Sequence, residues 1–210
     1  MPRNPERDRW HREEKRQRIV DAAREIFTLR GVTATKMSDI AAAAGLSHGN
    51  VYNYFGSKEE LLHTMVLQGQ DVYSGLLSRM QNQPGSALEK LEWLIEQFLL
   101  SSNASTTYWI VLQAQATDVL STEARNEITA IVHANREVII AIIEEGQREG
   151  SIAQWDSTEL ATVFLTAYHN MALWPIRGFG QPQPSVTGLI LKLLRPYPNQ
   201  EGNGPLGRPG

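Results

Sequence analysis

The residues best able to recognise another molecule stand close together between positions 48 and 54. In the segment HGNVYNY, five of the seven side chains can form hydrogen bonds and none is a carboxylate. An asparagine amide can pair bidentately with adenine, while tyrosine and histidine can reach phosphates or base edges. Gly49 leaves room for the close approach of a thymine methyl or a sugar-phosphate wall. These residue types indicate contact with nucleic acid.

Two short helices joined by a glycine turn would present these side chains outward. The first is expected over residues 37–44, and Gly45 follows where a helix commonly ends in left-handed geometry. Ser47 is a suitable N-cap for the second, which is expected over residues 48–54. A helix, a short turn and a second helix form a helix-turn-helix, which places its second helix in the major groove of DNA.

A third helix start follows at once. Ser57 and Glu60 have the spacing of a capping box, in which the serine caps the helix and the glutamate reaches back. Free amides at a helix start favour anions, and Lys58 stands beside them. This corner is therefore expected to bind a DNA phosphate.

At this point the chain resembles the N-terminal domain of TetR-type (TetR/AcrR) bacterial transcriptional regulators. The resemblance covers about residues 12 to 66. It rests on these residues: Ile19, Ala22, Ala23, Phe27, Gly31, Thr35, Ile40, Ala41, Ala44, Gly45, Leu46, Ser47, Tyr52, Tyr54, Phe55, Ser57, Lys58 and Glu59.

The resemblance implies an all-helical, homodimeric repressor whose larger C-terminal domain binds a small effector. It also assigns the DNA contacts to Thr35, Ser47, His48, Gly49, Asn50, Tyr52, Asn53, Tyr54 and Lys58. Within the family, the positions of His48 and Asn53 vary with the sequence that is read, so the resemblance does not define the operator.

Composition fits a cytoplasmic regulator. The 210 residues carry a net charge of −3 and include no cysteine, which excludes a disulfide scaffold and a cysteine-based zinc site. No apolar run is long enough to span a membrane, and the first 18 residues lack the apolar region of a signal peptide. Residues 1–63 hold 11 basic and 9 acidic residues, whereas residues 64–210 hold 9 and 14. This asymmetry fits a DNA-facing N-terminal part.

The basic N-terminal stretch has two interpretations. It is either a solvated arm or an arm that touches flanking phosphates or the minor groove. The first helix is expected to begin between Glu6 and Trp10 and to continue to Arg30, with an apolar stripe in its second half.

The remainder of the chain also has helical patterns and no convincing strand. We expect further helices at residues 58–80, 87–100, 107–119, 122–149, 156–174 and 186–194. The predicted fold is all-α with about nine helices. It comprises a three-helix DNA-binding domain at 1–56, an effector-binding and dimerisation domain at 57–195, and a disordered tail at 196–210.

The last two helices carry more apolar side chains than their mutual packing would bury. They could form a four-helix interface with a second copy, or close the core of their own chain. Aromatic and amide side chains of the C-terminal part are candidate walls for an apolar or aromatic effector: Trp93, Tyr108, Trp109, Gln113 and Tyr168.

We therefore expect a ligand-responsive transcriptional regulator, a repressor that binds a palindromic double-stranded operator as a dimer and is released by a small molecule. A helical interaction or small-molecule-binding protein without DNA binding is the alternative. No catalytic residue, metal site or cofactor is expected, because the sequence has no HExxH motif and no P-loop. His133 and Glu137 could form half of a metal site, although a surface hydrogen bond is the commoner outcome.

Overall fold

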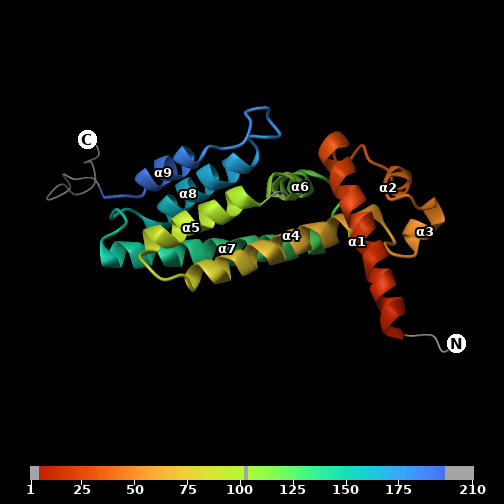
Figure 1. Cartoon of the computed structure of the whole chain (residues 1–210), viewed down its shortest axis with the longest axis horizontal. Helices are drawn as coiled ribbons and strands as arrows, with labels where there is room; N and C mark the ends of the chain where they lie inside the picture. Colours follow the sequence, from red (N-terminus) through yellow and green to blue (C-terminus); the bar gives the residue numbers. More distant parts are fainter. Residues whose placement is uncertain (1–4, 102–103, 197–210) are drawn as a thin grey trace. The chain divides into compact units, whose positions relative to one another are not determined.

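The computed structural model describes residues 5–101 and 104–196, and every regular element in these ranges is an α-helix (Figure 1). The all-α prediction is confirmed. In chain order the helices are α1 (Pro5–Arg30), α2 (Met37–Ala43), α3 (His48–Tyr52), α4 (Lys58–Gln81), α5 (Ala87–Leu100), α6 (Ala104–Ala116), α7 (Thr122–Glu149), α8 (Ser157–Ala172) and α9 (Pro184–Lys192). No helix in the described ranges is long and apolar enough to cross a membrane.

Several predicted helix ends were wrong by two or three residues. Helix α6 begins and ends three residues early, and its end has a local cause: the Thr117 hydroxyl accepts a hydrogen bond from the Val119 amide at 3.3 Å, which replaces helical bonding. Helix α9 begins at Pro184 rather than Val186, since proline is favoured in the first turn of a helix. The predicted disordered tail lies, apart from Pro196, outside the described residues.

The described chain divides into two compact units. The first combines residues 5–74 with 104–133, and the second combines 75–101 with 134–196. Helices α4 and α7 therefore each contribute residues to both units. The functional boundary after residue 56 stays a prediction.

The core of the first unit holds the predicted DNA-binding helices together with α6 and the start of α7. Phe27 of α1, Ile40 of α2 and Val51 of α3 are fully buried, and Ile110 and Ile128 belong to the same apolar cluster. Helix α1 packs on both α2 and α6. The side chains that anchor the predicted recognition helix thus share one core with a helix of the C-terminal part of the sequence.

The turn between α2 and α3 is fixed by backbone geometry. Gly45 has φ of 67°, a conformation that costs other residues a steric penalty. Its amide donates to the Ala42 carbonyl at 3.1 Å, and the Leu46 amide donates to the Ala41 carbonyl at 2.9 Å. This bonding is the Schellman pattern that ends helices, and it sets the direction in which α3 begins.

In the second unit, α5 meets the end of α7 through polar contacts and one close approach. Lys90 pairs with Glu145 at 2.7 Å, and the Ala87 amide donates to Glu149 at 2.6 Å. A side chain at Gly146 would lie only 2.9 Å from the Ala87 Cβ. The bonds from Ser151 and Ala87 lower the pKa of Glu149.

Most apolar side chains of α8 and α9 pack within their own chain. Phe164, Tyr168 and Ile190 are buried, which matches the interpretation that these helices close the monomer core. Val163 of α8 is an exception, and so are Leu189 of α9 and Leu193 directly after it, with 59% and 58% of their surfaces exposed. The i, i+4 spacing of the two leucines places them on one stripe at the end of α9.

Candidate nucleic-acid interface

The predicted DNA contacts differ in their exposure. Five of them are exposed at the start and along the outside of α3: Ser47, His48, Gly49, Tyr52 and Asn53. Asn50, Tyr54 and Lys58 are half-buried, whereas Thr35 is only 1% exposed. The structure therefore brings together a continuous set centred on α3 and leaves Thr35 inside the fold.

The exposed face of α3 is held by short-range contacts. The His48 and Tyr52 rings, one helical turn apart, meet edge to face with centroids 5.0 Å apart. Ser47 occupies the N-cap position with an extended backbone, but its hydroxyl makes no cap hydrogen bond. That hydroxyl is consequently available to an incoming acceptor or donor at the start of the helix.

The Lys58 side chain forms hydrogen bonds with backbone groups of its own chain. Its ammonium donates to the carbonyl oxygens of Val32 at 2.9 Å, Thr33 at 3.2 Å and Thr35 at 2.9 Å. Burial lowers the pKa of Lys58. An ammonium group has three hydrogens, and here all three have an acceptor. A phosphate contact by Lys58 would require at least one of these bonds to be exchanged.

The start of α4 is also capped by side chains of the same segment. Ser57 Oγ accepts the Glu60 amide at 3.0 Å, as the capping box predicts. The Glu60 carboxylate accepts the amide of Gly56 at 2.7 Å, one residue before the expected position. Two of the amides that could have bound a phosphate therefore already have acceptors, one of them a carboxylate.

Thr35 contributes to the fold of the loop between α1 and α2. Its hydroxyl donates to the Gly31 carbonyl at 2.7 Å. In this conformation the side chain fixes the loop that leads into α2, and its role as a DNA contact stays a prediction.

Gln113 joins α6 to the end of α1. The Val32 amide donates to Gln113 Oε1 at 2.9 Å, and Gln113 Nε2 donates to the Phe27 carbonyl at 3.2 Å. The Thr33 and Thr117 hydroxyl oxygens lie 3.3 Å apart beside this link. The sequence suggested Gln113 as an effector ligand, but both ends of its amide are bonded within the protein, so a ligand would have to replace those bonds.

A second link connects the starts of α4 and α7. The Ser121 amide donates to Glu59 Oε1 at 2.7 Å, and this bond lowers the pKa of Glu59. His63, one turn further along α4, lies 3.0 Å from Glu127 of α7. The helix that follows the recognition helix is thus tied to α7 at its first two turns.

The other candidate effector residues fall in different units. Tyr108 and Trp109 are half-buried in the first unit, where burial raises the pKa of Tyr108. In the second unit Trp93 is half-buried and Tyr168 is fully buried. The assignment of these residues to an effector site stays a prediction.

Tyr168 belongs to an aromatic cluster. Its ring centroid lies 4.7 Å from that of Phe98 and 5.8 Å from that of Phe164, with which it is stacked. The His169 ring follows at 5.2 Å, and burial lowers the pKa of His169 to about 4. Phe164 and Tyr168 are buried, so this cluster belongs to the core of the second unit.

The letters of residues 45–49, GLSHG, match the pattern GxSxG of hydrolase nucleophiles. That elbow needs a strand before the serine. Here Ser47 follows the turn after α2, and the described residues contain no strand. The described residues likewise include no group of three histidine, aspartate or glutamate side chains arranged to hold a metal ion.

Replacing Lys58 by methionine should lower the free energy of unfolding by about 1–3 kcal/mol, because partly buried carbonyl oxygens lose their donor. Lys36→Met, at an exposed position in the same region, should change it by less than about 0.5 kcal/mol. Urea denaturation followed by circular dichroism measures both. Equal midpoints for the two variants would contradict the structural role of Lys58.

Stability should also depend on pH through His169. Its folded-state pKa of about 4 lies below the ordinary value of 6.5, so the unfolded chain binds the proton more tightly. Stability should therefore be complete above pH 6.5 and fall as the pH decreases towards 4, by on the order of 2 kcal/mol at pH 5. His169→Gln should reduce the loss between pH 7 and pH 5 in urea denaturation, and an unchanged pH dependence would contradict this.

Comparison with known proteins agrees with this geometry. Residues 19–65 match the model described as "Bacterial regulatory proteins, tetR family", and residues 84–175 match "Tetracyclin repressor-like, C-terminal domain". The first match spans the second half of α1 through the start of α4, which includes all of the predicted DNA contacts.

Individual relatives are similar over most of their length. The HTH-type transcriptional repressor KstR2 of Rhodococcus jostii (strain RHA1) is 28% identical over 154 residues, covering 72% of this chain and 74% of the relative. The fatty acid metabolism regulator protein of Bacillus subtilis (strain 168) is 24% identical over 184 residues, covering 86% of this chain and 93% of the relative.

Solved structures have the same fold. AibR in complex with isovaleryl coenzyme A and operator DNA superposes with a TM-score of 0.71 at 22% identity, covering 86% of this chain and 98% of that chain. With both parts of the sequence matched and the helix-turn-helix in place, the chain belongs to the TetR family of bacterial transcriptional regulators.

Proposed function

We propose that the protein is a repressor that binds an operator as a homodimer and releases it when a small apolar molecule binds the C-terminal part. The observation that carries the proposal is the exposed face of α3, which offers hydrogen-bonding groups and no carboxylate. A negatively charged duplex would be repelled by carboxylates, whereas amide, imidazole and phenol groups can contact its bases and backbone.

Within this proposal the residues have different roles. His48 and Asn53 read base edges, while Ser47 and Tyr52 contact phosphates and Gly49 allows close approach. Asn50 and Tyr54 border this surface. Thr35 and Lys58 hold the loop before α2 in place, and Lys58 reaches a phosphate only by exchanging a carbonyl partner.

A second copy would cover the exposed leucines of α9. Leu189 and Leu193 are large apolar side chains left in water at the end of α9, whereas Ile190, Leu191 and Leu194 beside them are buried. Covering them in a symmetric interface would stabilise a dimer. A dimer would also present two recognition helices to an inverted repeat.

The effector is proposed to be a compound with an apolar skeleton. Phe98, Phe164 and Tyr168 bring aromatic rings together in the second unit, and because Phe164 and Tyr168 are buried, such a compound would have to displace part of this packing. Two similar proteins point to acyl chemistry: one is named as a fatty acid metabolism regulator, and the other, AibR, was solved in complex with isovaleryl coenzyme A. Acyl compounds are therefore the first class to test.

Release of DNA requires that the effector bind a DNA-incompetent arrangement more tightly than the competent one. Two links could transmit that preference to the DNA-binding helices. Gln113 connects α6 to the end of α1, and Glu59 connects the start of α4 to Ser121 of α7. A shift of α6 or α7 would strain or break these bonds and so change the position of α3.

The operator prediction can be tested with a duplex that the wild-type protein selects from a random-sequence pool. Footprinting should show an approximate inverted repeat whose half-sites lie about 34–36 Å apart or a multiple of that distance. His48→Ala and Asn53→Ala should change the preferred sequence, at a cost of roughly 1–3 kcal/mol at the affected base pair. Selection of no duplex would favour a small-molecule-binding protein that does not bind DNA.

The effector prediction can be tested by titrating intrinsic tryptophan fluorescence with isovaleryl coenzyme A, longer acyl thioesters and the free acids, with and without the selected duplex. The effector should bind less tightly when the duplex is present, with a coupling of about 1–3 kcal/mol. A compound that binds with the same affinity in both titrations is not the effector, however tightly it binds. If every compound that binds behaves in this way, the release mechanism is wrong.

A further inference from the structure

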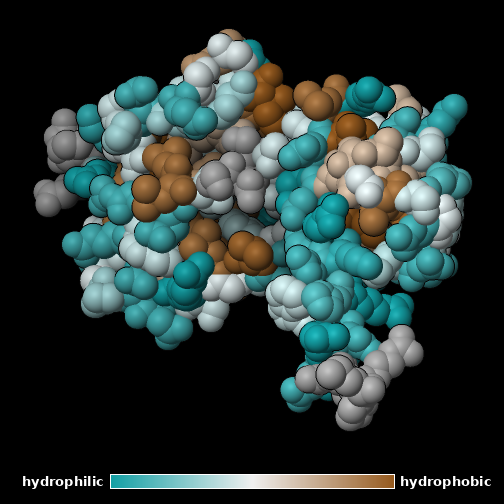
Figure 2. All heavy atoms as spheres, turned by 45° about the vertical axis from the view of Figure 1, so that its right-hand side comes forward, coloured by the Kyte–Doolittle hydropathy of each residue, from teal (hydrophilic) through white to brown (hydrophobic). Residues whose placement is uncertain are grey.

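The first half of α1 lies outside the apolar core of the first unit. Side chains 6–15 are all exposed, and the first fully buried residue of the helix is Ile19. The match to the family's N-terminal model also starts at residue 19. The first half of α1 therefore lies outside the residues that this model matches. Its surface next to the N-terminus is hydrophilic (Figure 2).

One face of this added segment is charged. Asp8, His11, Arg12 and Lys15 follow the spacing i, i+3, i+4, i+7, which places them on one side of a helix. Ile19 continues the same row four residues after Lys15, where it enters the core. The side of α1 that is apolar inside the domain therefore becomes charged where it leaves the domain.

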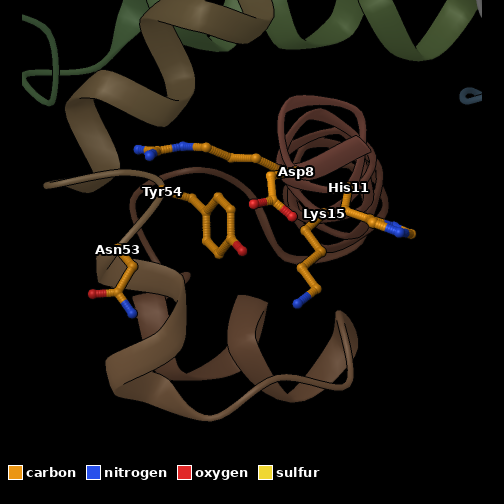
Figure 3. Close-up of a pocket in the computed structure, with 6 residues that line it drawn as sticks. Asp8, His11, Lys15, Asn53 and Tyr54 are labelled. Carbon is orange, nitrogen blue, oxygen red and sulfur yellow. The ribbon is translucent and has the colours of Figure 1, made fainter. Parts of the chain in front are cut away.

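An open cleft lies between this charged face and the end of the recognition helix. Its walls are Asp8, His11, Arg12 and Lys15 of α1 together with Asn53 and Tyr54, and its volume is about 270 Å³. In Figure 3 the Lys15 side chain and the Tyr54 ring extend into the space between α1 and the segment after α3. We propose that this cleft, which we call the α1 cleft, binds phosphates of the DNA strand beside the groove that α3 reads.

The position of the cleft is fixed by arginines further along α1. Arg16 donates to the Tyr54 carbonyl at 3.0 Å, and its guanidinium lies 4.2 Å from the centre of the Phe55 ring. Arg18 donates to the Ala44 carbonyl at 3.0 Å. These contacts hold α1 against the end of α2 and against the segment that follows α3. The helix backbone that carries Arg12 and Lys15 consequently stays beside the segment that follows α3.

The donors of the α1 cleft suit a phosphate. Arg12 and Lys15 have no hydrogen bond or ion pair with other described residues, so their charges are not neutralised locally. The Tyr54 hydroxyl and the Asn53 amide add uncharged donors. Asp8 is the only carboxylate among the lining residues, and the His11 ring pairs with Glu14 at 3.5 Å. Two cations against one carboxylate leave a net positive site.

This inference rests on the proposed DNA binding and extends it to a segment outside the family match. The test compares the wild type with Arg12→Gln/Lys15→Gln on the duplex that the wild-type protein selects. The matched control is Arg79→Gln/Arg148→Gln, which removes the same charge at exposed positions of α4 and α7. Fluorescence anisotropy at several salt concentrations gives the salt dependence, and phosphate ethylation interference locates the backbone contacts.

The cleft variant should lose about one unit of log–log salt slope for each cation removed per bound chain, while its preferred sequence stays that of the wild type. Interference should disappear at phosphates beside the half-site, and Lys15→Arg should retain it. If the cleft variant keeps the salt slope and interference pattern of the control, the α1 cleft does not bind DNA. A wild-type protein that selects no duplex would instead overturn the proposed function, and this inference with it.

Discussion

The loop between α1 and α2 is held by polar side chains from two distant helices, and the DNA-binding surface depends on it. Lys58 of α4 bonds to the carbonyl oxygens of Val32, Thr33 and Thr35, and Gln113 of α6 accepts the Val32 amide. Backbone groups that are removed from water need such partners, since an unpaired buried group costs about 1–3 kcal/mol. The loop can therefore keep its conformation only while α4 and α6 keep theirs.

This constraint gives the recognition helix a defined position. The loop leads into α2, the Gly45 turn sets the direction of α3, and Val51 anchors α3 in the same core as Phe27 and Ile110. A displacement of α6 would act on that core and on the Gln113 bonds together. The arrangement provides a physical route by which a ligand in the C-terminal part could change the binding of DNA, because packed cores move between discrete arrangements instead of deforming continuously.

Local features of the site could be predicted from the sequence. Gly45 identified the turn, the polar residues of α3 identified the exposed face, and the ends of α5 and α7 follow from capping residues and glycine. These features depend on neighbours a few residues away, where capping and periodicity act. The start of α9 was predicted two residues late, at Val186, because proline is common in loops as well as in the first turn of a helix, where Pro184 lies.

The long-range polar contacts could not be predicted in the same way. Gln113 lies 81 residues from Val32, and nothing in its local sequence distinguishes a glutamine that binds a ligand from one that bonds to a backbone. Lys58 looked like a phosphate ligand because its position at a helix start is typical of one, whereas its three carbonyl partners lie 23 to 26 residues earlier. The α1 cleft could not be predicted from the sequence for the same reason, since its two walls are 38 or more residues apart along the chain.

The most direct measurement of the coupling is amide hydrogen exchange at Val32, because this amide donates to Gln113. In the wild-type protein the Val32 amide should exchange slowly, and a saturating selected duplex should slow it further. The Leu160 amide, bonded to Asp156 at the start of α8, provides the internal reference. In Gln113→Leu the Val32 amide should exchange quickly in both states while Leu160 is unchanged. Exchange at Val32 that is the same with and without duplex would contradict the claim that DNA binding and α6 are coupled through this loop.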